Sequence, residues 1–223
     1  MLLIISGMKK YIAETLGTFS LLFCGTGAII INEQTNGTIT HVGVAMTFGL
    51  IVMAMIYSLG NISGAHLNPA VTIAFTMAKK FPPKEVMPYI LSQTTGALAA
   101  SFTLKYLFPL NENLGATLPS GTFAQSFILE IILTFILMLV IMNVATGGKE
   151  KGLFAGIAIG ATVMLEAMFA GPVCGASMNP VRSLAPAIAS GHTQHLWIYL
   201  IAPVLGAVLA IPIWQYLKIN ETV

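Results

Sequence analysis

The sequence contains very little charge. Of its 223 residues only 8% are Asp, Glu, Lys or Arg; there is no Asp at all, and Arg182 is the single Arg. Soluble domains carry roughly a quarter charged residues, so this composition, with 56% hydrophobic residues, excludes an ordinary soluble protein. A net charge of +2 provides no basic surface for nucleic acid, and we expect no nucleic-acid partner.

Cysteines and metal-binding patterns are also scarce. The two cysteines, Cys24 and Cys174, lie in apolar surroundings and form neither a metal-site pattern nor a disulfide framework. No nucleophile–base pair or metal cluster has a recognisable spacing. We therefore expect no cofactor, no metal and no enzymatic activity.

The chain instead contains long apolar stretches. Six of them are long enough to cross ~30 Å of hydrocarbon, which predicts an all-α membrane protein with a single transmembrane domain over residues 1–223. The predicted spans are approximately Tyr11–Ile31, His41–Gly60, Val86–Leu107, Phe123–Asn143, Gly152–Phe169 and Leu196–Leu217.

The placement of lysines predicts the orientation of these spans. The loops Asn32–Thr40 and Pro109–Gly121 contain no Lys or Arg, whereas lysines cluster in the segments at the other ends of the spans. By the positive-inside rule both termini of this multi-pass protein are cytoplasmic. Lys105 is the exception, and we expect its amine to extend to the membrane interface. The clustered lysines are Lys9, Lys10, Lys79, Lys80, Lys84, Lys149, Lys151 and Lys218.

Two shorter apolar stretches begin with the same motif. Ser63–Val71 and Cys174–Arg182 both contain Gly-Ala-x-x-Asn-Pro, and Asn-Pro favours a helix start because Asn caps helices and Pro fits their first turn. At ~1.5 Å per residue, the predicted helices Asn68–Lys79 and Asn179–Ser190 would reach about half-way across the bilayer. Two half-helices in corresponding places are typical of a membrane pore or transporter site.

The two halves of the chain repeat. The pattern Glu-x-x-x-Thr-Phe begins at Glu14 and again at Glu130, Asn-Pro occurs at Asn68 and Asn179, and Gly-Ala occurs at Gly96 and Gly206. The spacing between the two copies is nearly the same for all three motifs. Because each half has three spans, the second half enters the membrane upside down, and the half-helices meet N-terminus to N-terminus near the midplane. The predicted inverted 3+3 repeats cover approximately residues 8–108 and 122–218.

With these motifs the chain resembles the aquaporins, the major intrinsic protein family of water and small-solute channels, over essentially its whole length. The run from Leu165 to Pro180 is similar to the nodulin-like intrinsic proteins and their bacterial relatives. The resemblance implies a homotetramer with one pore in each subunit, and we expect it in a bacterial inner membrane. The second motif differs from the family in having Val181 where Ala is usual, which leaves the local pore shape open.

The two motifs are expected to supply the central donors and acceptors of the pore. The side-chain oxygens of Asn68 and Asn179 can cap the half-helices, which leaves their amide N–H groups to face a permeant oxygen. Facing helix N-termini also disfavour protons and cations at the midplane. Non-helical backbone at membrane depth is tolerated only where protein buries it or water wets it. The expected pore-lining carbonyls are those of Gly64, Ala65, His66, Gly175 and Ser177.

The resemblance also implies a four-residue constriction made of Phe48, Ala167, Ala176 and Arg182. Strict water channels of the family usually have His at the position of Ala167, so two alanines imply a wider and partly apolar ring. We therefore expect glycerol, urea and neutral metalloid acids such as arsenous or boric acid to pass with water, and protons and ions to be excluded. Ser183 follows the Arg where glycerol facilitators usually have Asp, and a strictly water-selective channel is the alternative.

The intramembrane carboxylates allow two interpretations. By the resemblance, Glu14 and Glu130 accept hydrogen bonds from the backbone N–H groups that lead into each motif. Alternatively they, or Glu166, carry protons in a coupled secondary transporter, which inverted repeats and broken helices would also allow. Glu166 lies about 100° round the helix from Ala167, so it bonds loop backbone or faces a neighbouring subunit. The ring of His66 either braces its loop or lines the pore.

Overall fold

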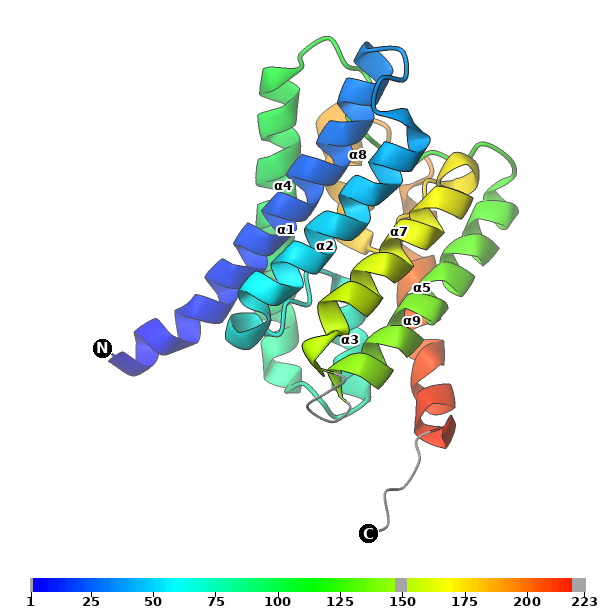
Figure 1. The fold of residues 1–223 in the computed structure, drawn as a ribbon. Coiled ribbons are helices and arrows are strands. Elements are labelled where there is room, and N and C mark those ends of the chain that lie inside the picture. The colour runs from blue at the N-terminus through cyan, green and yellow to red at the C-terminus, as the bar shows by residue number, and fades with distance from the viewer. Residues whose placement is uncertain (1, 147–151, 218–223) are drawn as a thin grey trace.

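The chain forms a bundle of long helices that encloses two short ones (Figure 1). The computed structural model describes residues 2–146 and 152–217, and this part of the chain contains no strand. The long helices are α1 (Leu2–Gln34), α2 (Thr40–Ser63), α4 (Val86–Leu107), α5 (Phe123–Ala145), α7 (Ala155–Cys174) and α9 (Leu196–Leu217). The short elements are α3 (Pro69–Met77), α8 (Pro180–Ser190) and one 3₁₀ turn, η1 (Pro83–Glu85).

Each predicted span overlaps a long helix, although α7 begins three residues later and ends five residues later than the predicted Gly152–Phe169. Within the described residues, α1, α2, α5, α7 and α9 are long and apolar enough to cross a membrane. Helix α4 has 22 residues, about 33 Å of helix, but it carries the polar run 92–95 and Lys105. Its central Gln93 is fully buried, so the most polar side chain of that run faces the bundle. With α4, the described residues form six spanning helices and two half-helices.

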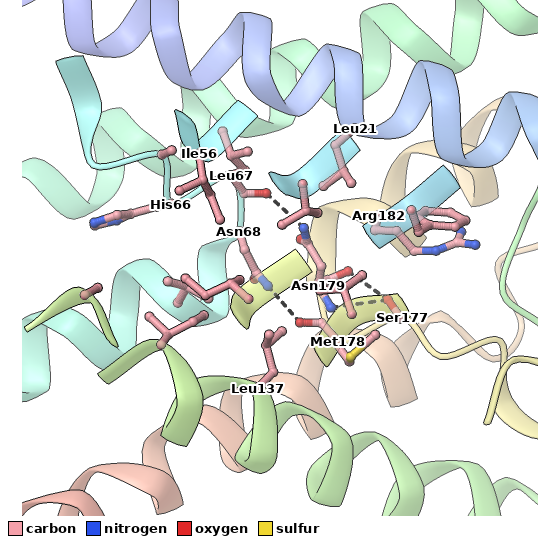
Figure 2. A pocket seen from close by; sticks show the side chains of 18 of the residues that line it. Leu21, Ile56, His66, Leu67, Asn68, Leu137, Ser177, Met178, Asn179 and Arg182 are labelled. Atoms are coloured by element: carbon pink, nitrogen blue, oxygen red, sulfur yellow. Dashed lines mark hydrogen bonds between the residues drawn. The ribbon is translucent and has the colours of Figure 1, made fainter. Parts of the chain in front are cut away.

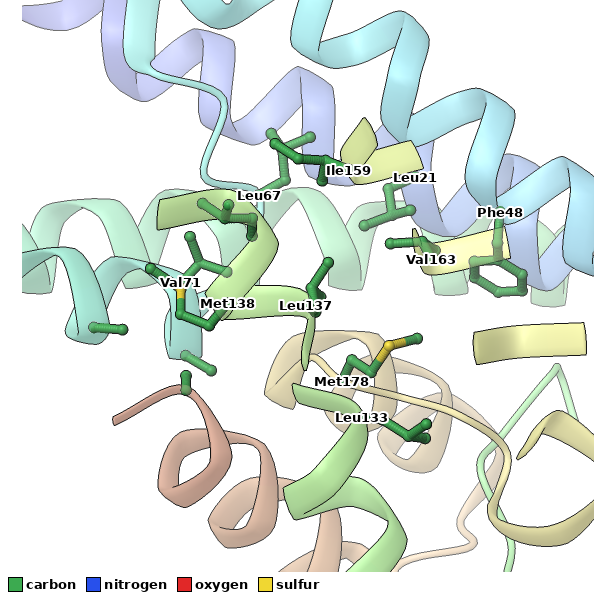
Figure 3. Close-up of a cluster of buried hydrophobic side chains, with 14 of the residues drawn as sticks. Leu21, Phe48, Leu67, Val71, Leu133, Leu137, Met138, Ile159, Val163 and Met178 are labelled. Atoms are coloured by element: carbon green, nitrogen blue, oxygen red, sulfur yellow. The ribbon is translucent and has the colours of Figure 1, made fainter. Parts of the chain in front are cut away.

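Large apolar side chains point out of the bundle, and small ones fill its helix contacts. Leu16, Leu91 and Ile128 are each more than half exposed, whereas Ala97 and Ala207 are completely buried. In a membrane, lipid offers large apolar side chains as good an environment as protein does, and small residues let helices approach closely. Larger buried side chains gather around the centre, where the half-helices begin, as Figure 3 shows for Leu137 and Met178.

The half-helices begin where the sequence predicts. Asn68 and Asn179 are extended N-caps, with φ of −157° and −152°, and each is followed by Pro at the first helical position. Helix α3 ends two residues earlier than predicted, because Lys79 adopts a left-handed φ of 56°. Helix α8 ends at Ser190, where Gly191 has a left-handed φ of 91°.

The contacts of the two halves correspond. Helix α1 packs on α4 as α5 packs on α9, while α3 contacts α9 and α8 contacts α4. A Cβ at Gly96 would lie 2.1 Å from the carbonyl oxygen of Thr15, and one at Gly206 would lie 2.3 Å from that of Ile131. Thr15 and Ile131 directly follow the two corresponding glutamates, Glu14 and Glu130. The repeat seen in the sequence therefore recurs in the backbone contacts.

Helices α2 and α7 cross where the two halves meet. A Cβ at Gly49 would lie 2.5 Å from the carbonyl oxygen of Gly160, and a Cβ at Gly160 would lie 2.6 Å from that of Gly49. Each glycine thus contacts the backbone of the other, and the two are as far apart along the chain as Asn68 and Asn179. No side chain larger than hydrogen fits this crossing.

Lysines gather at one end of the bundle, here called the basic face, which carries Lys9, Lys10, Lys79, Lys80 and Lys84. α1 begins and α9 ends on this side (Figure 1). The hydroxyl of Tyr11 donates to Glu85 Oε2 at 2.6 Å and Lys10 forms a salt bridge with the same oxygen at 2.9 Å. These contacts, the Tyr11 hydrogen bond first, hold the pKa of Glu85 below its usual value. Lys149, Lys151 and Lys218, which also entered the orientation prediction, lie outside the described residues.

Lys105 does not extend freely to the interface as the sequence led us to expect. Its Nζ donates a hydrogen bond of 2.6 Å to the carbonyl oxygen of Ala189 in the last turn of α8. The last carbonyls of a helix lack partners and carry partial negative charge, so a lysine amine is well placed there. Lys105 therefore joins α4 to the half-helix of the other repeat.

Candidate functional site

The two Asn side chains meet at the centre of the bundle and bind each other's loops. Each side-chain oxygen caps its own helix, Asn68 accepting from Ala70 N at 2.9 Å and Asn179 from Val181 N at 3.1 Å. The Nδ2 of Asn68 donates to the Met178 carbonyl at 2.8 Å, and that of Asn179 to the Leu67 carbonyl at 2.9 Å (Figure 2). An amide has two N–H groups, so one of each remains for a ligand.

This arrangement corrects one sequence expectation. We expected the whole amide group of each Asn to face a permeant molecule, but one N–H is committed to the opposite loop. The remaining pair of donors, one from Asn68 and one from Asn179, belongs to two residues that line the same central cavity. The hydrogen bonds to the opposite loops fix the rotation of both side-chain amides. An amide without such a bond would be free to rotate.

The segments before each Asn have a strained backbone with the same pattern. Ala65 and Leu67 have left-handed φ values of 47° and 52°, and Ala176 and Met178 have 40° and 54°. A non-glycine residue in this region costs roughly 1–2 kcal/mol. Such strain persists only where surrounding contacts over-determine it.

Most carbonyls of these two segments have no hydrogen-bond partner in the described part of the chain. Among the described residues, none of the five carbonyl oxygens named from the sequence accepts a hydrogen bond. Residues of this set line the central cavity, except Gly175, which lines the neighbouring one. The carbonyls of Leu67 and Met178 differ, since the two Asn side chains occupy them. The five carbonyls are those of Gly64, Ala65, His66, Gly175 and Ser177.

Glu14 provides acceptors for the first strained segment. One carboxylate oxygen accepts from Ser63 Oγ at 2.7 Å and from His66 N at 2.9 Å. The other accepts from Leu67 N at 2.7 Å and from Gln93 Nε2 at 2.8 Å. Glu14 is completely buried, and these four donors replace the water that the carboxylate has lost.

Glu130 plays the corresponding part in the second half with fewer donors. Its oxygens accept from Ser177 N at 2.7 Å and from Met178 N at 2.8 Å. Both backbone N–H groups lie in the segment with left-handed residues, so the carboxylate holds the strained conformation. Hydrogen bonds to an ionised acceptor are roughly twice as strong as neutral ones.

Sequence reasoning missed a pair of tyrosines that hold the same segments from outside. Tyr89 in α4 donates to the carbonyl of Ser63 at 2.8 Å, and Tyr199 in α9 donates to the carbonyl of Cys174 at 2.8 Å. Both rings are nearly or fully buried. Each tyrosine precedes the repeated glycine of its helix, Gly96 or Gly206, by the same number of residues. Aligning the two repeats would therefore have identified the pair from the sequence.

Two cavities meet inside the bundle. A central cavity of about 120 Å³ runs past the two Asn residues toward the basic face, and a cavity of about 400 Å³ opens toward the opposite end. Four residues line both cavities and therefore surround the place where they join. They are Phe48 from α2, Ala167 from α7, Ala176 from the second strained segment and Arg182 from α8.

The charged member of this ring is held in place from two sides. Arg182 is 4% exposed; its Nη1 donates to the carbonyl of Gly115 at 2.8 Å. Its guanidinium carbon lies 5.0 Å from the centre of the Phe48 ring, a cation–π contact. Since Arg182 and Phe48 are in contact, they leave no opening between them. The free space of the ring lies toward Ala167 and Ala176.

His66 combines the two roles that the sequence left as alternatives. Its ring stacks on Phe75 with 4.8 Å between centres, and its Nδ1 lies 3.1 Å from Thr72 Oγ1. Its backbone N–H binds Glu14, so the residue braces its loop. His66 also lines the central cavity on the side of the basic face, where Phe81 packs edge-on against it at 4.7 Å.

Two residues left open by the sequence lie away from the ring's surface. Glu166 is 6% exposed, and within the described residues neither of its oxygens has a hydrogen-bond partner. It therefore does not bond the described loop backbone, and its contact with a neighbouring subunit stays a prediction. Val181 is 2% exposed and lines neither cavity. The substitution of the usual Ala by Val181 thus changes packing inside the bundle, not the cavity wall.

Comparisons with known proteins agree with this architecture. The model of the family "Major intrinsic protein" matches residues 2–214. The chain is 49% identical over 216 residues to "Aquaporin NIP1-1" of Zea mays, covering 96% of this chain and 76% of that protein. It is 45% identical over 216 residues to "Nodulin-26" of Glycine max, covering 96% and 79%.

A solved structure shares the fold. The X-ray structure of the aquaglyceroporin from Plasmodium falciparum superposes with a TM-score of 0.83 at 28% identity, covering 94% of this chain and 96% of the other. The apolar spanning helices and these similarities make the chain an integral membrane protein of the aquaporin type. It belongs to the major intrinsic protein family.

Proposed function

We propose that the chain is a passive channel for water and for small uncharged solutes such as glycerol, urea and neutral arsenous or boric acid. The observation that carries this proposal is the ring at the junction of the two cavities. Two of its four walls are alanines, and its two large members, Phe48 and Arg182, pack on each other. Small apolar walls opposite a guanidinium donor suit a molecule with one hydroxylated edge and one apolar edge.

The proposed path uses the unpaired polar groups in order. Arg182 donates to the solute oxygen at the ring, carbonyls of the strained segments accept its hydroxyl hydrogens, and the free N–H groups of Asn68 and Asn179 donate at the centre. These partners replace water one after another, so an uncharged solute is never fully stripped of hydrogen bonds.

Ions meet the opposite situation. The N-termini of α3 and α8 both face the centre, where each contributes about half a positive charge. Together with Arg182 they disfavour cations and protons. The proposal therefore includes exclusion of protons and ions. The positive-inside rule supports a cytoplasmic location for the basic face.

The assembly and the membrane are finer points of the proposal. We propose a homotetramer, as the aquaporin resemblance implies, with a separate pore in each subunit. Multi-angle light scattering of the purified protein in detergent measures the number of subunits. The bacterial inner membrane stays a prediction without support, since the relatives named above are plant proteins.

Stopped-flow light scattering of proteoliposomes tests the solute range. Vesicles with the protein should shrink faster in an impermeant osmolyte, and reswell faster with glycerol or urea, than protein-free vesicles. Fast water flux with no reswelling would favour the strictly water-selective alternative. Uphill solute transport driven by a pH gradient would favour the proton-coupled alternative, for which Glu166 is the buried carboxyl without a partner among described residues.

A double variant tests the ring itself. Ala167→His with Ala176→Thr adds bulk and polarity to the two small walls. Changes of one methylene alter discrimination by about tenfold or more where fit is tight. We therefore expect glycerol flux to fall about tenfold or more while water flux falls much less. Equal losses of both fluxes would contradict the assignment of the ring.

A further inference from the structure

Helix α7 contains a proline whose missing N–H is replaced from the neighbouring helix. Pro172 lacks the amide hydrogen that would bind the carbonyl of Met168, four residues earlier. His41 in α2 occupies this place, with its Nε2 2.7 Å from the Met168 oxygen. Because a carbonyl only accepts, Nε2 carries the hydrogen. Gly171 provides the room, since a Cβ there would lie 2.9 Å from Cε1 of His41.

This bond joins the two helices that carry two walls of the ring. Met168 directly follows Ala167 in α7. His41 lies seven residues before Phe48 in α2, which is two turns away on the same helix face. His41, Phe48 and Ala167 all line the cavity that opens opposite the basic face. The His41 bond therefore links α2 to α7 across their contact, here called the seam. It lies on the side of the ring that is away from the basic face.

Helices α2 and α7 are also held together at two other points along the seam. At its centre α2 and α7 are in backbone contact through Gly49 and Gly160. Toward the basic face, the hydroxyl of Tyr57 in α2 donates to the carbonyl of Leu153, just before α7, at 3.1 Å. The His41 bond is the matching tie on the other side of the crossing. Without it, the ends of α2 and α7 can separate about the glycine contact.

We propose that His41 is a positioning residue that holds the ring narrow by supplying the donor that Pro172 lacks. This inference rests on the proposed function, because it concerns the width of the solute path. It makes the selectivity of the channel depend on a side chain that is no part of the ring. The dependence exists only while residue 172 is proline.

The test measures glycerol and water permeability of full-length variants in proteoliposomes. His41→Ala and His41→Leu remove the donor, with and without loss of bulk, and His41→Gln keeps an N–H donor. One hydrogen bond shifts an equilibrium about two- to tenfold, so the two donor-free variants should raise the glycerol-to-water permeability ratio about two- to tenfold. His41→Gln should return the ratio to the wild-type value. A purely structural loss would lower both fluxes together and leave the ratio unchanged.

The Pro172→Ala background supplies the decisive control. The substituted alanine would have its own N–H for the Met168 carbonyl, so His41→Ala in that background should leave the ratio unchanged. The proposal is overturned if the donor-free variants keep the wild-type ratio, or if their effect persists beside Pro172→Ala. These outcomes differ from failure of the proposed function, in which the wild-type protein would carry no glycerol at all.

Discussion

Glu130→Gln tests directly how the second strained segment is held. The Glu130 oxygens accept from Ser177 N at 2.7 Å and from Met178 N at 2.8 Å, one N–H for each oxygen. Glutamine has nearly the same shape, but an NH₂ group replaces one oxygen and cannot accept. One of the two backbone N–H groups therefore loses its acceptor and faces another donor.

The magnitude follows from the burial of these groups. Glu130 is completely buried and Ser177 is 5% exposed, so water does not readily replace the lost acceptor. A buried donor left unsatisfied costs about 1–3 kcal/mol, and hydrogen bonds to charged acceptors contribute about 1.5–3 kcal/mol. On this basis we expect Glu130→Gln to lower the free energy of unfolding by about 2–3 kcal/mol. Water permeability should fall as well, because Met178 also receives a hydrogen bond from Asn68.

Glu166→Gln is the matched control. The chemical change is identical and Glu166 is 6% exposed, but no hydrogen bond to a described residue is lost. Removing an ionisable group from such a site also removes its desolvation cost, so stability should stay the same or rise. Unfolding by SDS in mixed micelles, followed by tryptophan fluorescence, measures both variants. Equal destabilisation of the two would refute the reasoning, since burial and not bracing would then set the cost.

Three further substitutions, one of them a control, test the ring and the helix contacts. Arg182→Ala should admit protons or small cations, seen as faster decay of a pH gradient across proteoliposomes; an unchanged decay would exclude Arg182 from the barrier. Gly96→Ala would set a Cβ 2.1 Å from a backbone oxygen of α1 and should cost ~3 kcal/mol or more, at the upper end for overpacking, measured by SDS unfolding. Gly60→Ala, whose Cβ would meet nothing within 4 Å, should fold normally, and a loss as large as that of Gly96→Ala would contradict the argument.

The parts that sequence could predict are those written in local motifs and in the repeat register. Asn-Pro specifies an N-cap followed by a first helical residue, so α3 and α8 begin at the predicted positions. A glycine at the same place in two repeats marks the same close contact twice, as at Gly96 and Gly206. The six spans follow from length and hydropathy, with α4 recognisable despite its polar run.

The contacts that the sequence did not predict depend on which segments meet across the bundle. The Arg182–Gly115 bond involves a loop without any motif, and the bond from Lys105 to Ala189 joins two repeats. The contact of Arg182 with Phe48 sets the free side of the ring, but spacing along the chain contains no information about it. These contacts are decided by packing, where no local pattern recurs.

The central bonds make the two halves mechanically dependent on each other. The N–H of Met178 donates to Glu130, and its carbonyl accepts from the Nδ2 of Asn68. The N–H of Leu67 donates to Glu14, and its carbonyl accepts from the Nδ2 of Asn179. Each carboxylate therefore positions, through one left-handed residue, the Asn donor of the opposite half. Each Asn oxygen caps its own half-helix, but each Nδ2 is oriented by a carbonyl of the opposite loop. The orientation of the two central donors therefore depends on the packing of the two loops against each other.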